Sequence, residues 1–411
     1  MSDVDVFDPA VFARAVPHEA LRRLRDEEPV AWQDEHAVGE WPAGPGFWAV
    51  TRYDDVRTVL RTPEVFSSSL GATQIRDPEP GDLPFIRRMI LNMDPPEHGR
   101  LRKLVTAAFT RRRLERFADD VAARARRLID EVAGDGHCDL PSQVTDDFPL
   151  TNLAELMGVP ESDRGLLLAW TNRVIGYQDP EHADVVRDEH GRPVNPRSPA
   201  MLAEMFAYAG ELADHKRRHP ADDVMTALVE ARVDGESLDD TELAMFFFLL
   251  TIAGNDTVRS ALPGGVLALV EHPEQYRLVR ERPDVLPQAI EEMLRWHPPV
   301  LTFRRTAARD TTLGGAEIAA GDKVVVYHVS AHHDERHFAD PFRFDVTRDP
   351  CDHLAFGQGP HLCLGAHFAR LQLRAFFGAF TGALPEVALD GEPRRLTSNF
   401  INGVTRLPLR W

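Results

Sequence analysis

Apolar residues recur at spacings of three and four along most of the chain, a pattern typical of amphipathic helices. Eight segments, separated by proline and glycine, carry this pattern: 17–28, 97–133, 151–170, 200–218, 222–233, 239–270, 273–297 and 364–381. Strand-like runs are shorter, at 47–51, 302–307, 323–327 and 399–409. The pattern therefore predicts a mainly α fold with small β-sheets, and it shows no internal repeat.

Two segments stand out from this pattern. The insert 178–199 (QDPEHADVVRDEHGRPVNPRSP) is rich in charge and proline and lies between two helical segments, so it is either an ordinary surface loop or a mobile lid. The most apolar stretch, 243–253, is too short to span a bilayer. We therefore expect no membrane anchor.

The composition narrows the class of protein. The 411 residues include 65 acidic and 47 basic side chains, a formal net charge of −18, which excludes a generic polyanion binder. The chain has only Cys138, Cys351 and Cys363, and its start, MSDVDVFDPA, lacks the pattern of a signal peptide, so we expect a reduced, cytoplasmic protein. Three cysteines cannot build a Cys₄ zinc site, so metal chemistry that uses cysteine must rest on one thiolate.

The strongest chemical signal surrounds Cys363, in the run Phe-Gly-Gln-Gly-Pro-His-Leu-Cys-Leu-Gly at 356–365. Its glycines allow the backbone to close around the sulfur, and the helix that follows favours an anion at its N-terminus. Both features stabilise a thiolate, which a buried structural cysteine does not need. His361 is also a candidate base for a cysteine nucleophile, so a cysteine hydrolase is the alternative at this point.

The spacing F-G-x-G-x-H-x-C-x-G resembles the haem-ligand loop of the cytochrome P450 family, the haem-thiolate monooxygenases, in their soluble bacterial type. The matching residues are Phe356, Gly357, Gly359, His361, Cys363 and Gly365. The resemblance covers about 10–411 and implies the cytochrome P450 fold, as one haem domain (1–411) without a fused reductase. It implies haem b (iron protoporphyrin IX), with Cys363 as the iron ligand and the other five residues around it. The hydrolase alternative lacks an oxyanion site and an orienting acid in the sequence.

A second motif, Ala-Gly-Asn-Asp-Thr at 253–257, closes the most apolar stretch within a predicted helix. A glycine followed by an acid and an alcohol lets a helix bend locally and hold water beside a ligand. The resemblance implies that Ala253 and Gly254 lie at the haem, that Asp256 relays protons, and that Thr257 orders water during dioxygen activation. Taken alone, the motif is more simply a helix interior with an exposed acid and a back-bonding threonine.

The resemblance also supplies partners for the two haem propionates. His98 and Arg102 lie four apart on the helix that begins at Asp-Pro-Pro-Glu, so they share one face. Arg305 and His361 match the third and fourth propionate positions. Arg304 precedes Arg305 on a strand and is therefore expected to point to the opposite face.

Other family positions have a structural meaning. E-x-x-R occurs at seven places, and most such pairs are solvated helix faces, but only Glu292 and Arg295 stand at the family position ahead of the cysteine loop. We expect that pair to support the proximal side of the haem. Where many members read A-N-R-D, this chain has histidines at 332 and 333, which we interpret as surface or packing residues because adjacent side chains on an extended segment diverge.

Between residues 100 and 116 the charge is locally reversed, with one acid, Glu115, against seven cations: Arg100, Arg102, Lys103, Arg111, Arg112, Arg113 and Arg116. On a chain of net charge −18 this segment is either a solvated helix face or, as we favour, a docking patch for an acidic electron donor. Because no reductase is fused, the resemblance implies a ferredoxin and an NAD(P)H-dependent ferredoxin reductase as partners. Arg102 is withdrawn from the patch if it binds a propionate.

The positions that match the family's substrate contacts are predominantly apolar: Met89, Ile90, Leu91, Leu249, Leu250, Val300, Leu301, Phe400 and Ile401. They predict hydroxylation of an apolar small molecule of the sterol, terpenoid or fatty-acid type, although such stripes also simply form core. A secondary-metabolite tailoring enzyme that couples, desaturates or demethylates its substrate is the main alternative. A peroxide-driven variant and a non-catalytic haem sensor or electron carrier are further ones.

Overall fold

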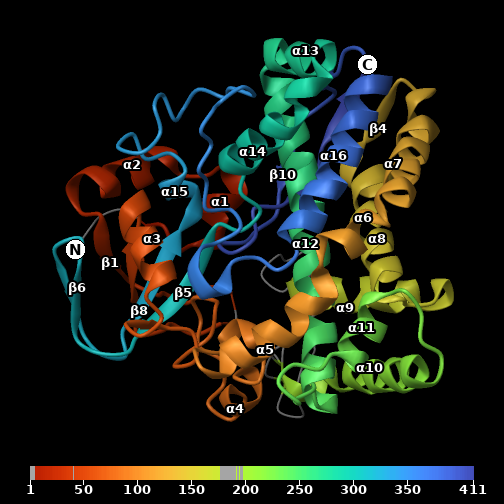
Figure 1. Ribbon diagram of the computed structural model, residues 1–411. Coiled ribbons are helices and arrows are strands. Elements are labelled where there is room, and N and C mark those ends of the chain that lie inside the picture. The colour runs from red at the N-terminus through yellow and green to blue at the C-terminus, as the bar shows by residue number, and fades with distance from the viewer. Residues whose placement is uncertain (1–4, 40, 176–190, 192–193, 195–197) are drawn as a thin grey trace.

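The computed structural model describes residues 5–39, 41–175, 191, 194 and 198–411 (Figure 1). The insert 178–199, a loop or lid by its sequence, lies almost entirely outside these residues. The described chain forms a helical part around the long helix α12 (Asp240–Glu271) and a smaller part built on a five-stranded sheet. This architecture confirms the prediction of a mainly α fold with small sheets.

Each of the eight segments with helical spacing contains helix. The helices are α1 (Pro9–Arg14), α2 (His18–Glu27), α3 (Tyr53–Arg61), α4 (Leu83–Ile86), α5 (Glu97–Thr106), α6 (Arg111–Glu115), α7 (Ala118–Ala133), α8 (Asp147–Met157), α9 (Arg164–Ile175), α10 (Pro199–Arg218), α11 (Val224–Glu230), α12, α13 (Pro273–Glu281), α14 (Leu286–Trp296), α15 (His328–Ala331) and α16 (Ala366–Ala383). Three of the predicted segments are each divided into more than one helix. Thr110 caps α6 within 97–133, Gly158 ends α8 within 151–170 with a φ of 70°, and Pro283 follows α13 within 273–297.

The four strand-like runs all contain strands, although 399–409 holds two very short ones. The strands are β1 (Val30–Gln33), β2 (Phe47–Val50), β3 (Phe66–Ser67), β4 (His137–Asp139), β5 (Thr302–Ala307), β6 (Thr311–Leu313), β7 (Ala316–Ile318), β8 (Lys323–Tyr327), β9 (Ala388–Leu389), β10 (Arg394–Arg395), β11 (Val404–Arg406) and β12 (Pro408–Arg410). The largest sheet has the order β1-β2-β8-β5-β3, with β2 and β8 parallel and the other neighbours antiparallel.

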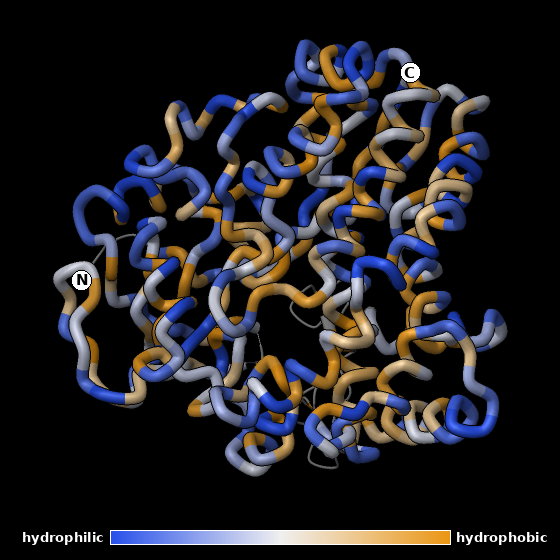
Figure 2. The backbone as a smooth tube through the Cα atoms, viewed as in Figure 1, coloured by the Kyte–Doolittle hydropathy of each residue, from blue (hydrophilic) through white to orange (hydrophobic). Residues whose placement is uncertain are grey.

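Helix α12 runs through the interior because its sequence is apolar on almost every side. Asp239 and Glu242 form a capping box at its start, and most of its 32 residues are buried. It packs against α8, α10, α14 and α16, and Figure 2 shows apolar residues gathered along these inner faces while polar residues occupy the outer turns. No helix among the described residues, α12 included, is long and apolar enough to cross a membrane.

Candidate active site

The cysteine loop, residues 356–365, folds into a tight turn ahead of α16. The Cys363 amide donates to the Phe356 carbonyl oxygen at 2.9 Å. Gly357 and Gly359 have φ of 69° and 70°, in the left-handed region that favours glycine. A Cβ on Gly359 would stand 2.5 Å from the carbonyl oxygen of Leu60, because the loop packs against the end of α3. Gly359 does not line the cavity beside Cys363, so its contribution is this packing rather than contact with a cofactor.

Cys363 is exposed to a large cavity inside the molecule, bordered by α12 and α16, which we call the cysteine cavity. The amides of Gly365 and Ala366, at the start of α16, lie where they favour a negative charge on its sulfur. Burial raises the pKa of the Cys363 thiol, while these amides and the nearby cations Arg102 and Arg370 act in the opposite direction. The groups expected to stabilise a thiolate therefore surround the sulfur, and metal binding is what would offset its burial.

The four predicted propionate partners line this same cavity: His98, Arg102, Arg305 and His361. The ring centroids of His98 and His361 lie 4.2 Å apart, and Arg102 donates to the Leu362 carbonyl oxygen at 2.7 Å. Burial, with Arg305 nearby, lowers the pKa of His361 to about 3, and burial also lowers the pKa of His98. Both histidines are therefore neutral hydrogen-bonding groups, and the cations of the set are the two arginines.

Arg304 and Arg305 are neighbours on β5 and face opposite sides of the sheet, as predicted. Arg304 pairs with the Asp77 carboxylate at 2.6 Å. Arg305 is 4% exposed, donates to the Arg304 carbonyl oxygen at 2.8 Å and forms no ion pair with any residue that the structure describes. Burial lowers the pKa of Arg305 to about 10. A buried cation without a carboxylate is costly, so the wall of the cysteine cavity is suited to an anionic ligand.

Helix α12 borders the cysteine cavity through Ala253, Gly254 and Thr257. The Thr257 hydroxyl donates to the Ala253 carbonyl oxygen at 2.7 Å, one turn back along the helix. Asp256 is 2% exposed and its carboxylate lies 3.9 Å from the guanidinium of Arg259, so it is not the exposed acid of the simpler interpretation. The acid and the alcohol thus lie side by side, with Thr257 lining the cavity that holds Cys363.

The pair Glu292 and Arg295 is fully buried and forms two contacts, at 2.6 and 2.8 Å. Arg295 also donates to the His332 carbonyl oxygen, and the ring of His332 accepts the Leu354 amide at 2.8 Å, just ahead of the cysteine loop. The sequence left open whether His332 and His333 are surface or packing residues. Both are at most 1% exposed, so they are packing residues. The Glu292–Arg295 pair is therefore linked through His332 to the segment ahead of the cysteine loop, in agreement with the structural role expected of it.

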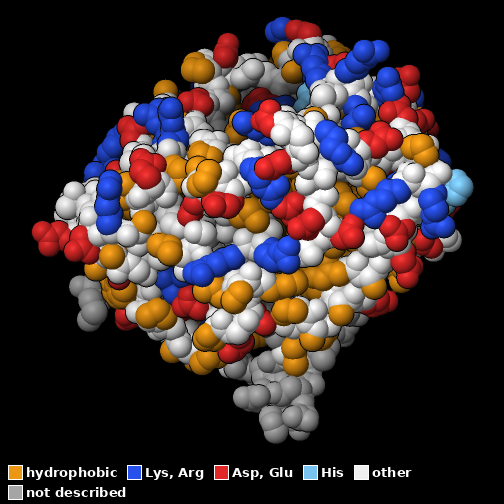
Figure 3. All heavy atoms as spheres, turned by 60° about the horizontal axis from the view of Figure 1, so that its bottom comes forward, with side chains coloured by type: hydrophobic (Ala, Val, Ile, Leu, Met, Phe, Trp, Pro, Cys, Tyr) orange, Lys and Arg blue, Asp and Glu red, His pale blue; other side chains and the backbone are white. Residues whose placement is uncertain are grey.

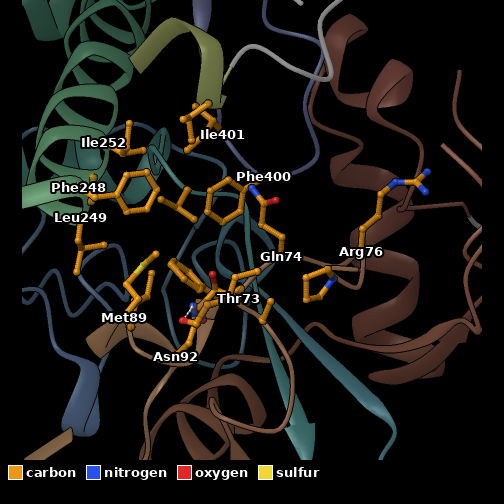
Figure 4. Close-up of a pocket in the computed structure, with 18 of the residues that line it drawn as sticks. Thr73, Gln74, Arg76, Met89, Asn92, Phe248, Leu249, Ile252, Phe400 and Ile401 are labelled. Atoms are coloured by element: carbon orange, nitrogen blue, oxygen red, sulfur yellow. Dashed lines mark hydrogen bonds between the residues drawn. The ribbon is translucent and has the colours of Figure 1, made fainter. Parts of the chain in front are cut away.

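A second cavity, the adjoining cavity, meets the cysteine cavity at six shared residues: Leu91, Leu249, Ala253, Thr257, Val300 and Phe303. Most of the side chains that line it are aliphatic or aromatic, which suits an apolar ligand. Eight of the nine predicted substrate contacts line one or both cavities (Figure 4): Met89, Phe400 and Ile401 the adjoining one, Ile90 and Leu250 the cysteine one, and Leu91, Leu249 and Val300 both.

Leu301 is the exception, and its assignment to the substrate pocket is wrong. It is 1% exposed and packs in a core cluster with Phe47 and Tyr327. Successive residues of an extended segment point to opposite sides, so when Val300 faces the cavities Leu301 faces away.

Five polar residues of the adjoining cavity were not anticipated from the sequence: Thr73, Gln74, Arg76, Asp77 and Asn92. They belong to the irregular segment between β3 and α5, where neither helical nor strand periodicity indicates which side chains face inwards. The one available signal is their position ahead of the Asp-Pro-Pro-Glu helix start.

The basic segment 100–116 does not form one open patch. Acidic side chains pair with four of its cations: Arg100 with Glu236 and Glu242, Arg111 with Glu115, and Arg113 and Arg116 with Asp222. Figure 3, which brings the α5 end of the molecule forward, accordingly shows blue and red side chains interspersed. Lys103 and Arg112 are exposed and form no ion pair with the described residues.

Comparison with known proteins identifies the family. The family model described as Cytochrome P450 matches residues 200–381. A steroid C26-monooxygenase of Mycobacterium tuberculosis is 38% identical over 407 residues, which cover 97% of this chain and 90% of that relative. The chain belongs to the cytochrome P450 family. A methyl-branched lipid omega-hydroxylase of the same organism is 40% identical over 397 residues, covering 95% of this cytochrome P450 and 90% of the relative.

The solved structures agree with this assignment. A Mycobacterium marinum cytochrome P450 in complex with pseudoionone has a TM-score of 0.87 and 38% sequence identity, covering 100% of this chain and 99% of that chain. The protein is therefore a cytochrome P450 monooxygenase, a haem-thiolate enzyme that uses protoporphyrin IX haem. The cysteine cavity fits this group: the Cys363 thiol faces it beside the amides that begin α16, and Arg305, buried and without an ion pair among the described residues, suits a propionate.

Proposed function

We propose that this cytochrome P450 hydroxylates the end of an aliphatic chain on an apolar molecule of the sterol, terpenoid or branched-lipid type. The observation that carries the proposal is the junction of the two cavities, because the shared residues are aliphatic or aromatic apart from Thr257. An aliphatic chain end enters such a passage without losing hydrogen bonds to water. The names of two relatives, steroid C26-monooxygenase and methyl-branched lipid omega-hydroxylase, support attack at a chain end.

In this proposal Cys363 is the iron ligand, and the bound haem supplies the oxygen-activating chemistry. Phe356, Gly357, Gly365 and Ala253 line its cavity. We assign the propionates to Arg102 and Arg305 as counter-charges and to His98 and His361 as neutral hydrogen-bond partners, in accordance with their burial.

Proton delivery is assigned to α12. Thr257 holds water next to the reacting centre, where its hydroxyl is oriented by the Ala253 carbonyl oxygen. Asp256 supplies protons from the solvent side. Its neighbour Arg259 also lies 3.5 Å from Asp146, whose side chain is 41% exposed, so a chain of charged groups leads from Asp256 towards the surface.

Electrons are assigned to an acidic ferredoxin and its NAD(P)H-dependent reductase. The exposed cations Lys103 and Arg112, with Arg374 on α16, form what we call the proximal cations. Arg102 of α5 reaches Leu362, and α6 packs against α16, so these elements lie beside the cysteine loop. On a chain of net charge −18 they offer an acidic donor a local attractive site.

The test combines a spectrum with product analysis. The dithionite-reduced protein under carbon monoxide should show the long-wavelength Soret band of a thiolate ligand. Turnover of a cholestane ketone under ¹⁸O₂, with a ferredoxin and reductase, should then give an alcohol that carries one labelled oxygen on a terminal carbon. A desaturated or coupled product without label, or oxygen inserted in the middle of the molecule, would contradict the proposal.

A further inference from the structure

The end of the adjoining cavity that lies away from Cys363 is formed by the segment 72–78, which is not part of the cysteine cavity. Two cations, Arg304 and Lys323, contact this segment, and both are paired with carboxylates. The Asp77 carboxylate lies 2.6 Å from Arg304 and 2.7 Å from Lys323, and Glu35 lies 2.6 Å from Lys323. Two positive and two negative charges therefore cancel at this wall, and they attract no further anion.

The remaining cation of the segment, Arg76, is directed elsewhere. Its guanidinium donates to the Pro42 carbonyl oxygen at 2.6 Å and lies over the Phe7 ring, 5.7 Å from the centroid. In Figure 4 the Arg76 side chain extends away from the apolar side chains of the cavity. Arg76 therefore lines the cavity, but its guanidinium is held by the Pro42 carbonyl oxygen and the Phe7 ring rather than by the apolar part of the cavity.

Gln74 has the opposite orientation. Its side chain extends towards the Phe400 ring, which stands between the Gln74 amide and Phe248 in this view, and Gln74 lines the adjoining cavity (Figure 4). A glutamine amide carries both donors and an acceptor, so it can bond a ketone oxygen or an alcohol. A carboxylate placed there would lose its hydration without gaining a cation, because Arg304 and Lys323 are already paired with Asp77.

We propose that this end of the cavity selects substrates whose far terminus is a neutral oxygen group, a ketone or an alcohol, over those that end in a carboxylate. Gln74 makes the hydrogen bond to that group, and the aliphatic end of the substrate reaches the junction with the cysteine cavity. The inference rests on the proposed function, because it concerns the other end of the same substrate. It separates sterol-like substrates from fatty acids within that function.

The test uses three ligands with one skeleton: 5α-cholestane, its 3-ketone and its 3-carboxylic acid. Each is titrated into the haem-loaded protein at pH 8, and the spin-state shift of the Soret band gives the dissociation constant. The ketone should bind about tenfold or more tightly than the acid. Gln74→Leu should weaken the ketone about two- to tenfold, the effect of one neutral hydrogen bond, and leave cholestane unchanged.

Two further variants keep the test decisive. Gln74→Lys places a cation at this end and should reverse the order, so that the acid binds more tightly than the ketone. Arg76→Met is the matched control, because its guanidinium points away, and it should leave the ratio of the two affinities unchanged. An acid that binds as tightly as the ketone, or an acid affinity that falls tenfold in Arg76→Met, would overturn the inference.

Product analysis distinguishes this inference from the proposed function. Preference for the ketone, combined with oxygen inserted away from the chain end, overturns the proposed function and supports the role of Gln74. Hydroxylation at the chain end of the acid, with equal affinity for acid and ketone, overturns the inference alone. A protein that shows the thiolate spectrum but no spin shift with any of the three ligands overturns both.

Discussion

Arg304 and Arg305 are adjacent on β5, yet their electrostatic surroundings differ. Arg305 is buried and forms no ion pair with the residues that the structure describes, so we expect it to destabilise the haem-free protein and to be offset by an anionic ligand. We expect Arg305→Met to raise the melting temperature of the apoprotein and to weaken haem binding about ten- to hundredfold. Calorimetry of the apoprotein and haem transfer to apomyoglobin measure the two effects.

The matched control for this prediction is Arg304→Met. It leaves Asp77 with one cation fewer, so the apoprotein should melt at a lower temperature. If Arg305→Met lowered the apoprotein melting temperature in the same way, Arg305 would be compensated in the haem-free protein and the propionate assignment would lose its support.

The second prediction at the residue scale concerns Thr257. Its hydroxyl is the polar group that α12 presents at the junction of the two cavities. Thr257→Ala should reduce the product formed per NAD(P)H consumed about tenfold or more and raise hydrogen peroxide release, because protons are no longer delivered in an ordered way. The substrate-induced spin shift should remain, and Thr257→Ser should restore coupling. Unchanged coupling in Thr257→Ala would count against the role of Thr257 in proton delivery.

At the scale of elements, the pair Glu292 and Arg295 joins α14 to the segment ahead of the cysteine loop. Arg295→Leu leaves the buried Glu292 with Arg348, at 3.0 Å, as its remaining cation, and it removes the donor to the His332 and Pro341 carbonyl oxygens. We therefore expect the free energy of unfolding to fall by about 3 kcal/mol. Haem incorporation should fall with it, because His332 and the loop lose their support. Urea unfolding and the ratio of Soret to protein absorbance measure these effects.

The chain offers a control with the same spacing. Glu19 and Arg22 form an E-x-x-R pair on α2 at 3.1 Å, but their side chains are 84% and 48% exposed. Arg22→Leu should therefore change neither the unfolding curve nor the haem content, since water replaces the lost contact. Equal effects of the two substitutions would show that burial is not what gives the Glu292 pair its importance.

For the whole molecule, the charge distribution governs electron transfer. The net charge of −18 repels an acidic ferredoxin, and the proximal cations offset this repulsion locally. We expect Arg112→Glu to slow reduction by a ferredoxin several-fold at low salt, with the difference shrinking as ionic strength rises. Arg280→Glu changes the net charge equally on the distant α13 and should have little effect. Stopped-flow reduction under carbon monoxide measures both, and equal slowing would exclude a localised docking site.

Local features of this protein were determined by the sequence itself. The cysteine loop could be recognised because its requirements lie within ten consecutive residues: glycines with positive φ, a cysteine and a following helix. The four residues proposed as propionate partners and the motif of α12 were placed by resemblance, and they line or border the same cavities. Most helices and the main strands followed from periodicity, because burial of one face imposes it.

Only the tertiary structure decided which charges are neutralised and which side chains face the ligand. Arg100 meets Glu242 from a position 142 residues away, Arg304 meets Asp77 and Lys323 meets Glu35, and no local pattern encodes such pairs. Likewise, whether the side chains of Leu301 and Gln74 point towards a cavity or away from it depends on the path of irregular segments across the cavities. Sequence periodicity indicates which side of a single helix or strand is buried. Substrate specificity at this site depends instead on side chains from elements that are distant in the sequence, and only the tertiary structure brings these together.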